Sequence, residues 1–349
     1  MQTDISYHNY YEGLMVWNGK ALQETEGWIA QLDTQDVASI SSAVAATRTR
    51  PLSELSPNDF DFGNFGNRLQ ALRDEVLQGK GFVVLHGLPG NEWSDEELVR
   101  AYWGIGQWFG DPVSQNAKAH LLGHVIDQRG PAAADTRIYQ TNRAQPFHSD
   151  SCDIVGLLCL RKAKAGGTSA IASSAAIYNH LLAKQPAMLR ELCGQFQCDR
   201  YGEIPAGKLP WYTVRVFNHI DDNLVCCGMD PDIRSAQRLD NVTPLTASQA
   251  HALDAFQDTA RELALNMTLE RGDIQLVNNH VVVHARGSFE DYEDRNRRRY
   301  MARLWLSSPL GRELPDFLSE RWGNIKAGTK RGGISVPGAK PVVYLDPDH

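Results

Sequence analysis

The chain has 349 residues, of which 42% are hydrophobic and 22% are charged, and its formal net charge is -7. This composition is typical of a globular protein, and the negative charge argues against a nucleic-acid partner. The amino terminus lacks the basic start and apolar stretch of a signal peptide. No segment approaches the ~18 apolar residues of a membrane span. We therefore expect a cytoplasmic protein without a membrane partner.

The six cysteines form no CxxC pair, which predicts reduced thiols rather than a disulfide framework. A bridge between Cys193 and Cys198 is the alternative that their spacing allows. The sequence also contains no internal repeat and no low-complexity linker.

The first 60 residues show no clear period, and we expect irregular structure there. Apolar residues at helical spacing predict a helix over 67–78 that ends near Gly79. The run 81–88 then predicts a short buried strand. A second helix is expected over 94–110, because Ser94 and Glu97 form a capping box ahead of an apolar stripe.

Strand-like sequence dominates from about residue 137. Two helices, around 174–183 and 187–194, interrupt it, and the segment 212–228 has the pattern of a hairpin. Thr246 and Gln249 form the capping box of another helix. The remaining strand-like runs are RIYQ (137–140), PFHSDSCDIVGLLCLR (146–161), GGTSAIASS (166–174), NMTLERGD (266–273), IQLVNNHVVVHAR (274–286) and YMARLWLSS (300–308).

Strands and helices do not alternate along the chain, and no GxGxxG motif follows a strand. This argues against a doubly wound parallel sheet. We instead expect an α+β fold with a mainly β core, in which two sheets are flanked by helices.

His148 and Asp150 are the first candidates for chemistry. Side chains at positions i and i+2 of a strand point to the same face, so the imidazole and the carboxylate would project together. Such a pair can bind a divalent metal, but it can also be a simple hydrogen-bonded pair. A metal site needs a third ligand from another strand.

The segment 274–286 offers two candidates for that ligand, His280 and His284. In an uninterrupted strand both lie on one face, and spacing alone does not choose between them. Two histidines and one carboxylate leave open metal positions, as in the facial triad of non-haem Fe(II) oxygenases. An organic dicarboxylate at those positions needs a cation, and Arg303 lies within an apolar strand-like run.

With these residues identified, the sequence resembles the TauD/TfdA family of Fe(II)- and 2-oxoglutarate-dependent dioxygenases. The resemblance rests on FHSD, on the GGTSAIASS region, and on GDIQLVNNHVVVHAR followed by RRRYMARLWL, in that order. It covers roughly residues 67–309. It implies a double-stranded β-helix (jelly roll) flanked by helices, of the clavaminate-synthase-like type. We expect one domain, 1–349, with the segments 1–60 and 310–349 packed on this core.

The resemblance also implies roles for individual residues. His148, Asp150 and His284 would be the catalytic iron ligands, and His284 is preferred to His280 because it follows the NN stretch at the family's spacing. Arg303 would anchor 2-oxoglutarate, assisted by Ser169 after the GGT turn. Arg299 would meet an anionic group of the substrate, although an insertion after His284 leaves Arg298 or Arg299 as rival anchors.

The expected activity couples conversion of 2-oxoglutarate and O2 to succinate and CO2 with oxidation of an aliphatic C–H bond, most simply hydroxylation. Asp150 argues against a halogenase, because those members of the superfamily carry a small residue there. The segment TNRAQP, before His148, departs from the taurine enzymes and leaves the substrate open. Desaturation, cyclisation or epimerisation in a biosynthetic pathway is an alternative, as is a non-catalytic cupin-like metal-binding protein. A homo-oligomer is compatible with the sequence.

Overall fold

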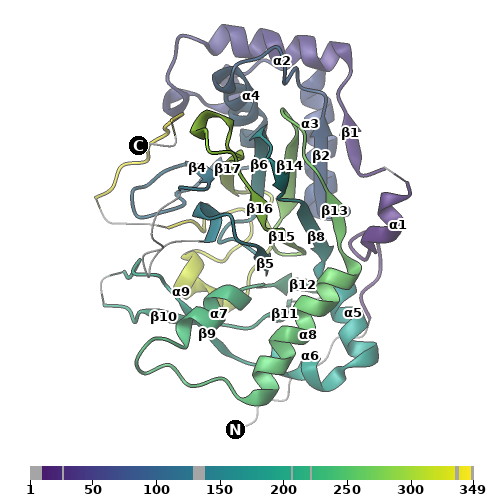
Figure 1. Ribbon diagram of the computed structural model, residues 1–349, viewed down its shortest axis with the longest axis vertical. Helices are drawn as coiled ribbons and strands as arrows, with labels where there is room; N and C mark the ends of the chain where they lie inside the picture. The colour runs from purple at the N-terminus through teal and green to yellow at the C-terminus, as the bar shows by residue number, and fades with distance from the viewer. Residues whose placement is uncertain are drawn as a thin grey trace.

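Two β-sheets face each other at the centre of the structure and are covered by helices on their outer sides (Figure 1). This arrangement is the jelly roll that the sequence predicted. The computed structural model describes residues 10–25, 27–128, 138–205, 207–220, 222–334 and 338–346.

The larger sheet has seven strands in the order β1-β2-β14-β6-β17-β3, with β4 also paired to β17. The β1–β2 pair is parallel, and the other neighbours are antiparallel. Its strands are β1 (Ile29–Gln31), β2 (Phe82–His86), β3 (Asp111–Pro112), β4 (Leu122–Ile126), β6 (Ile154–Arg161), β14 (Ile274–Asn278) and β17 (Tyr300–Ser307).

The smaller sheet has four antiparallel strands in the order β13-β8-β15-β5. These are β5 (Gln145–His148), β8 (Ser169–Ser173), β13 (Leu265–Met267) and β15 (Val282–Arg286). Three two-stranded ribbons complete the β structure: β7 (Ala165–Gly166) with β16 (Phe289–Glu290), β9 (Phe196–Asp199) with β10 (Trp211–Val214), and β11 (Phe217–Ile220) with β12 (Asn223–Cys226).

Helices cover the outer faces of the two sheets. Helices α3 and α4 pack on the larger sheet, and α2 packs on these two helices. Helices α5, α6 and α8 lie at the opposite end of the molecule in Figure 1. The α-helices are α1 (Gly19–Gln23), α2 (Thr34–Thr47), α3 (Asn64–Gln78), α4 (Asp95–Gln107), α5 (Ser174–Lys184), α6 (Pro186–Leu192), α7 (Asp230–Ala236), α8 (Ala247–Leu263) and α9 (Ser319–Trp322), and the 3-10 turns are η1 (Leu52–Glu54), η2 (Pro57–Asp59), η3 (Ile138–Gln140), η4 (Arg295–Arg297) and η5 (Asp316–Leu318).

Strand β17 shows how the core sorts its side chains. Tyr300, Leu304 and their alternate neighbours join the apolar cluster beneath helices α2–α4. The intervening residues Met301 and Trp305 belong to the cluster between the two sheets. Because side chains alternate along a strand, Arg303 also points into the space between the sheets.

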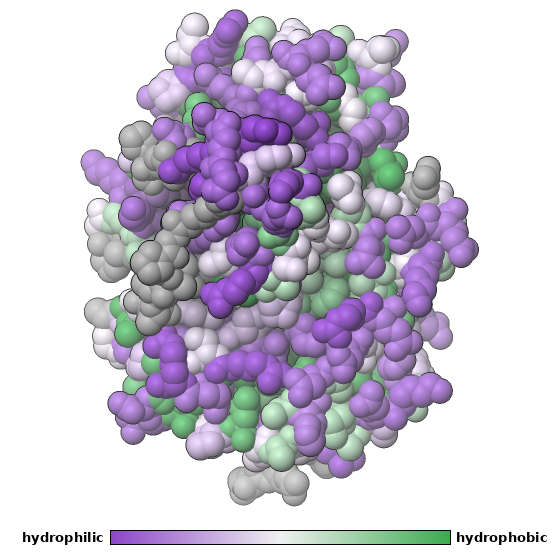
Figure 2. Space-filling view, viewed as in Figure 1, coloured by the Kyte–Doolittle hydropathy of each residue, from purple (hydrophilic) through white to green (hydrophobic). Residues whose placement is uncertain are grey.

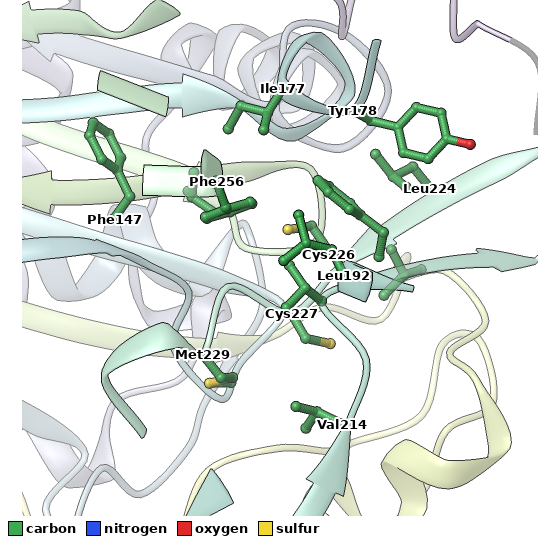
Figure 3. Close-up of a cluster of buried hydrophobic side chains, with 14 of the residues drawn as sticks. Phe147, Ile177, Tyr178, Leu192, Val214, Leu224, Cys226, Cys227, Met229 and Phe256 are labelled. Carbon is green, nitrogen blue, oxygen red and sulfur yellow. The ribbon is translucent and has the colours of Figure 1, made fainter. Parts of the chain in front are cut away.

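The smaller sheet sorts its residues in the same way. Phe147 and Val283 lie in the large apolar cluster under α5 and α8, part of which Figure 3 shows around Phe147 and Phe256. Their neighbours His148 and His284 therefore face the opposite side, toward the larger sheet. Burial of one face thus fixes which polar side chains enter the space between the sheets.

Two segments that were predicted as single strands are each divided between the sheets. The run 274–286 forms β14 in the larger sheet and β15 in the smaller one, with a turn at 279–281. The run 146–161 likewise separates into β5 and β6, joined by the linker 149–153. The prediction failed because both sheets are buried. The segments before and after the crossing therefore have the same apolar pattern, and the sequence does not show where the chain leaves one sheet for the other.

Two further expectations were wrong. The segment 1–60 is not irregular throughout, because it contains α1, β1 and α2. Helix α2 has a capping box between Asp33 and Asp36 and buries Ile40 and Val44. RIYQ is not a strand: residues 138–140 form a 3-10 turn, and Arg137 lies outside the described residues. The capping boxes predicted at Ser94 and Thr246 are both confirmed.

All six cysteines are buried free thiols, so the Cys193–Cys198 bridge is not formed. None of the helices in the described part of the chain has the length and hydrophobicity needed to cross a bilayer. Hydrophilic side chains cover most of the face in Figure 2, and hydrophobic residues form small separate groups there.

The capping box of helix α2, which the sequence analysis did not predict, provides a test of this helix. Asp33→Ala removes the side chain that accepts hydrogen bonds from the Gln35 and Asp36 amides. We expect the free energy of unfolding to fall by ~1 kcal/mol. Gln35→Ala is the matched control and should change it by less than ~0.5 kcal/mol. Urea denaturation measures both, and equal effects would contradict the assigned cap.

Candidate active site

His148, Asp150 and His284 come together between the two sheets. Their ligand atoms all lie within 4.8 Å of one another. His148 Nε2 is 3.9 Å from Asp150 Oδ1, and His284 Nε2 is 3.8 Å from Asp150 Oδ2. Two atoms that each bond one ion at ~2.1 Å can be at most ~4.2 Å apart, so both of these separations allow a shared metal.

The smaller sheet positions the two histidines. His148, the last residue of β5, is the register partner of His284 on the adjacent strand β15. Their ring centroids are 4.2 Å apart with an interplanar angle of 50°. Asp150 is not on the strand, as the sequence prediction assumed, but in the linker 149–153 just after it. The carboxylate reaches the histidines because the linker turns toward the larger sheet.

Contacts from the larger sheet orient the Asp150 carboxylate. Trp305 Nε1 donates a hydrogen bond of 2.8 Å to Oδ2, and Arg303 Nη1 lies 3.5 Å from the same oxygen. The backbone amide of Asp150 donates to Asn279 Oδ1 at 3.2 Å. Since Oδ2 is occupied by these partners, Oδ1, which faces His148, is the oxygen best placed to bind a metal.

The hydrogen bonds of His148 indicate its tautomer. Its Nδ1 lies 2.9 Å from the carbonyl oxygen of Pro146, which can only accept, so Nδ1 carries the proton. Nε2 then keeps its lone pair, and the amide of Gln145 donates to it at 2.8 Å. Metal ligation by histidine typically uses this arrangement. The Gln145 amide would have to turn away from Nε2 when a metal binds there.

The three side chains carry the protonation states that metal binding requires. Burial lowers the pKa of His148, and it lowers that of His284 to about 3. Burial alone would raise the pKa of Asp150, but Arg303 and the two histidines favour the carboxylate and hold its pKa below the usual range. Neutral imidazoles and an ionised carboxylate suit a divalent ion of the iron type.

A cavity of about 670 Å³ opens at this cluster. His148, Asp150, Arg303 and Trp305 form part of its wall. Further polar side chains of both charges and of neutral type also line it: Gln115, Lys118, His120, His124, Gln140, Gln145, Glu203, Asp232 and Arg321. The volume is in the range of sites for small organic molecules.

Three comparisons with known proteins identify relatives of the chain. Residues 48–305 match the family model described as "Taurine catabolism dioxygenase TauD, TfdA family". The chain belongs to this family. It is therefore an Fe(II)- and 2-oxoglutarate-dependent oxygenase, as the sequence predicted, and the cluster of two histidines and one aspartate is able to hold its iron.

Two curated relatives cover nearly the whole chain. FR-33289 synthase of Streptomyces rubellomurinus is 31% identical over 91% of this chain and 96% of its own length. A taurine hydroxylase-like protein of Stachybotrys chartarum is 30% identical over 88% of this chain and 82% of its own length.

Solved structures of two oxygenases share the fold at low identity. Asparagine oxygenase, solved with Fe(II), hydroxyasparagine and succinate, has a TM-score of 0.61 and 17% identity over 80% of this chain and 93% of that one. The non-haem iron oxygenase OrfP, solved with Fe and alpha-ketoglutaric acid, has a TM-score of 0.59 and 13% identity over 81% and 95%.

The other residues that the family resemblance suggested lie in different places. Arg303 is beside the metal cluster, where its Nε donates to Gln115 Oε1 at 2.7 Å. Ser169 and Arg299 are buried and do not line the cavity. Arg298 donates to the backbone carbonyls of Asp127 and of the turn at 292–293.

His280 lies in the turn between β14 and β15 rather than on a strand with His284. Its Nε2 is 2.8 Å from Asp153 Oδ1, and His284 rather than His280 belongs to the cluster that could hold a metal ion. The uninterrupted strand that would have placed both histidines on one face does not form.

Sequence reasoning missed two residues of the site, Trp305 and Gln115, and gave no role to the buried Arg286. Trp305 could have been found, because it lies two positions after Arg303 and therefore shares its face of the strand. Gln115 gave no signal, since its segment reaches Arg303 only in the folded chain. Arg286 shares a strand face with His284, but a role for it depends on burial that the sequence does not reveal.

The low pKa of His284 predicts an acid dependence for the metal-free protein. Between about pH 6.5 and 4 the unfolded chain takes up a proton at this histidine and the folded protein does not. Stability that is present above pH 6.5 is therefore lost as the pH falls. Urea denaturation at several pH values gives the slope of the free energy of unfolding against pH. We expect His284→Gln to reduce this slope by about 1.4 kcal/mol per pH unit. Parallel curves for the two proteins would contradict the assignment.

Proposed function

We propose that this oxygenase hydroxylates an aliphatic carbon of a small organic molecule that carries an anionic group. The observation that carries the proposal is the position of Arg303, a buried guanidinium on the cavity wall within 3.5 Å of the metal-ligating carboxylate. A substrate anion bound there would lie next to the metal centre. Lys118 and Arg321 are further cations on the wall of the same cavity, which also carries the carboxylates of Glu203 and Asp232.

We assign His148, Asp150 and His284 as the iron ligands. Iron with 2-oxoglutarate supplies the activation of dioxygen when both are bound. The protein contributes position: Trp305 and Arg303 orient the carboxylate, and the Pro146 carbonyl orients the imidazole of His148. The cavity walls hold the target carbon and exclude bulk water.

We assign the 2-oxoglutarate anchor to Arg299 with Arg286, which exchanges the roles expected from the family resemblance. Both guanidiniums are buried, and Arg286 Nε and Nη1 and Arg299 Nη1 have no hydrogen-bond partner among the described residues. They flank the ring of Phe289, at 5.0 and 5.4 Å from its centroid. Burial, together with their mutual repulsion for Arg286, lowers the pKa of each to about 10.

The spacing from the metal cluster supports this assignment. Arg286 follows His284 by two residues on the same face of β15, which separates the two positions by about 7 Å. The short dicarboxylate 2-oxoglutarate can bridge such a distance. Arg303, in contrast, lies 3.5 Å from Asp150 itself, which is nearer to the metal cluster than the far carboxylate of a bound 2-oxoglutarate would be.

Ser169 keeps its expected role under this assignment. It is the register partner of Arg286 on the adjacent strand β8, so both side chains face the same side. Arg299 packs against the turn just before it, where a Cβ atom on Gly167 would lie 3.1 Å from Arg299 Nε. One hydroxyl on β8, one guanidinium on β15 and one on the residue before β17 would thus serve the same carboxylate.

The names of the curated relatives support oxidation of a small molecule. One is called a synthase and the other a taurine hydroxylase-like protein. The first name favours a role in forming a product, and the second is compatible with an anionic substrate. We therefore place the reaction in a biosynthetic route.

A turnover screen tests the proposed reaction. Small carboxylates, sulfonates and phosphonates should stimulate release of succinate, whereas uncharged analogues of the same compounds should not. The product should gain one oxygen atom, and loss of two hydrogens would instead indicate desaturation. His148→Ala should abolish turnover, and His251→Ala, an exposed histidine on α8, should leave it unchanged. If no compound stimulates succinate formation, and iron with 2-oxoglutarate gives no anaerobic absorption band, the proposal fails.

A matched pair of variants tests the two arginine assignments. Arg299→Gln should raise the Kd for 2-oxoglutarate at least tenfold, because a charge-assisted pair is lost. Arg303→Gln should raise the KM for the substrate by a similar factor and, at saturating metal, change the Kd for 2-oxoglutarate much less than Arg299→Gln does. Titration and steady-state kinetics separate the two effects. The reverse result would restore Arg303 as the anchor.

A further inference from the structure

The carboxyl-terminal tail reaches the back of the metal centre. Arg331, in a segment that follows the family-matched residues 48–305, is buried with its side chain 0% exposed. Its Nε and Nη2 each lie 2.9 Å from Asp153 Oδ1. Asp153 ends the linker 149–153, in which Asp150 is the metal ligand. An ion pair thus joins the tail to the segment that carries this ligand.

The tail and the linker are fitted closely to each other. The amide of Gly333 donates to the carbonyl of Ser151 at 2.7 Å. Gly332 has a φ of +76°, and a Cβ atom there would lie 2.7 Å from the same carbonyl oxygen. Only glycine permits this approach. The tail therefore contacts Ser151 and Asp153, which lie just after Asp150 in the chain.

The remaining hydrogen bonds of the Arg331 guanidinium go to backbone carbonyls of the tail itself. Nη1 donates to the carbonyls of Ile325 and Lys326, and Nη2 donates to that of Arg312 at 2.6 Å. The backbone amide of Arg331 donates to Ser307 Oγ at the end of β17. The arginine therefore ties together the tail, β17 and the linker.

Asp153 is also held from the other side. His280 Nε2 lies 2.8 Å from Oδ1, and the Ser308 amide donates to Oδ2 at 3.0 Å. The neighbouring Asn279 bonds the Asp150 amide with Oδ1 and the Cys152 carbonyl with Nδ2. The linker is consequently clamped between the 279–280 turn and the tail.

The same tail segment also supports Arg303, the cation beside Asp150. The amide of Ile334 donates to the Ser114 carbonyl at 2.8 Å, and the next residue, Gln115, holds Arg303 through both its amide oxygen and its amide nitrogen. Residues 331–334 thus brace both partners of the Asp150–Arg303 contact.

We propose that Arg331 is a positioning residue, which through Asp153 fixes the linker so that Asp150 is held in its metal-binding orientation. The inference rests on the proposed metal site. Loss of the guanidinium would leave the linker free to move and the carboxylate disordered over several positions. The tail then helps to position a metal ligand and does not merely cover the surface of the core.

Metal affinity of the full-length apo-protein tests the proposal. Anaerobic Fe(II) titration, and Mn(II) titration followed by electron paramagnetic resonance of the free ion, give the Kd. We expect Arg331→Met to raise the Kd about tenfold or more, in the range typical of residues that support metal ligands. Arg331→Lys should recover part of the loss.

Arg200→Met is the matched control. Arg200 is also buried, and its Nη2 binds Glu320 of the tail at 2.9 Å, but its side-chain hydrogen bonds in the described part of the chain go to Leu209 and Glu320 and not to the linker 149–153. Its variant should keep the Kd within about twofold of the wild type. An Arg331→Met protein that folds and binds metal like the wild type overturns the proposal. If that variant does not fold, Asp153→Asn is titrated instead, and an unchanged Kd overturns the proposal in the same way.

A measurement on the wild type removes the dependence on any variant. Because coupling is reciprocal, metal binding should slow hydrogen exchange at the amides of Arg331–Ile334 and leave helix α2 unchanged. Unaltered exchange in the tail would overturn the clamp. Failure of the wild type to bind Mn(II) or Fe(II) would instead contradict the proposed function. Metal binding with no response in the tail or in the variants rejects only the positioning role.

Discussion

The position of the Asp150 carboxylate is the constraint on which the rest of the structure depends. The chain that carries it leaves the smaller sheet at His148 and enters the larger sheet at Ile154, so Asp150 is presented between the two. A buried carboxylate is costly unless charges and donors surround it. Trp305 and Arg303 supply them from the facing strand β17. The jelly roll thus brings ligands from one sheet together with their support from the other.

Buried arginines reveal what the space between the sheets is built to receive. Arg303 has Asp150 and Gln115 as partners, whereas Arg286 and Arg299 have unpaired nitrogens among the described residues. Two buried cations side by side repel each other and lose hydration, and an incoming dicarboxylate relieves both costs. Under the proposed assignment, the co-substrate would stabilise this unfavourable arrangement. Arg286 and Arg299 would then receive the co-substrate, and Arg303 would receive a substrate anion.

The family region alone does not contain every contact of the metal centre. It ends at residue 305, but the linker beside Asp150 is bonded by Arg331 and Gly333. The tail was expected to lie on the core, and instead Arg331 enters it. A charged residue is buried there because Asp153 and three backbone carbonyls satisfy the guanidinium. The fold of the chain end is consequently joined to the linker that carries Asp150.

The sequence by itself determined the chemistry: the HxD pair, a distal histidine and an arginine in an apolar strand predicted the iron oxygenase and its jelly roll. Helix caps at Ser94 and Thr246 were also readable, because capping depends on neighbours a few residues apart. Tertiary structure decided the rest. The turn at 279–281 places His284 rather than His280 in the cluster that could hold a metal, and Gln115 and Arg331 make their contacts across 188 and 178 residues. Such contacts depend on which strands become neighbours, and local periodicity does not contain that information.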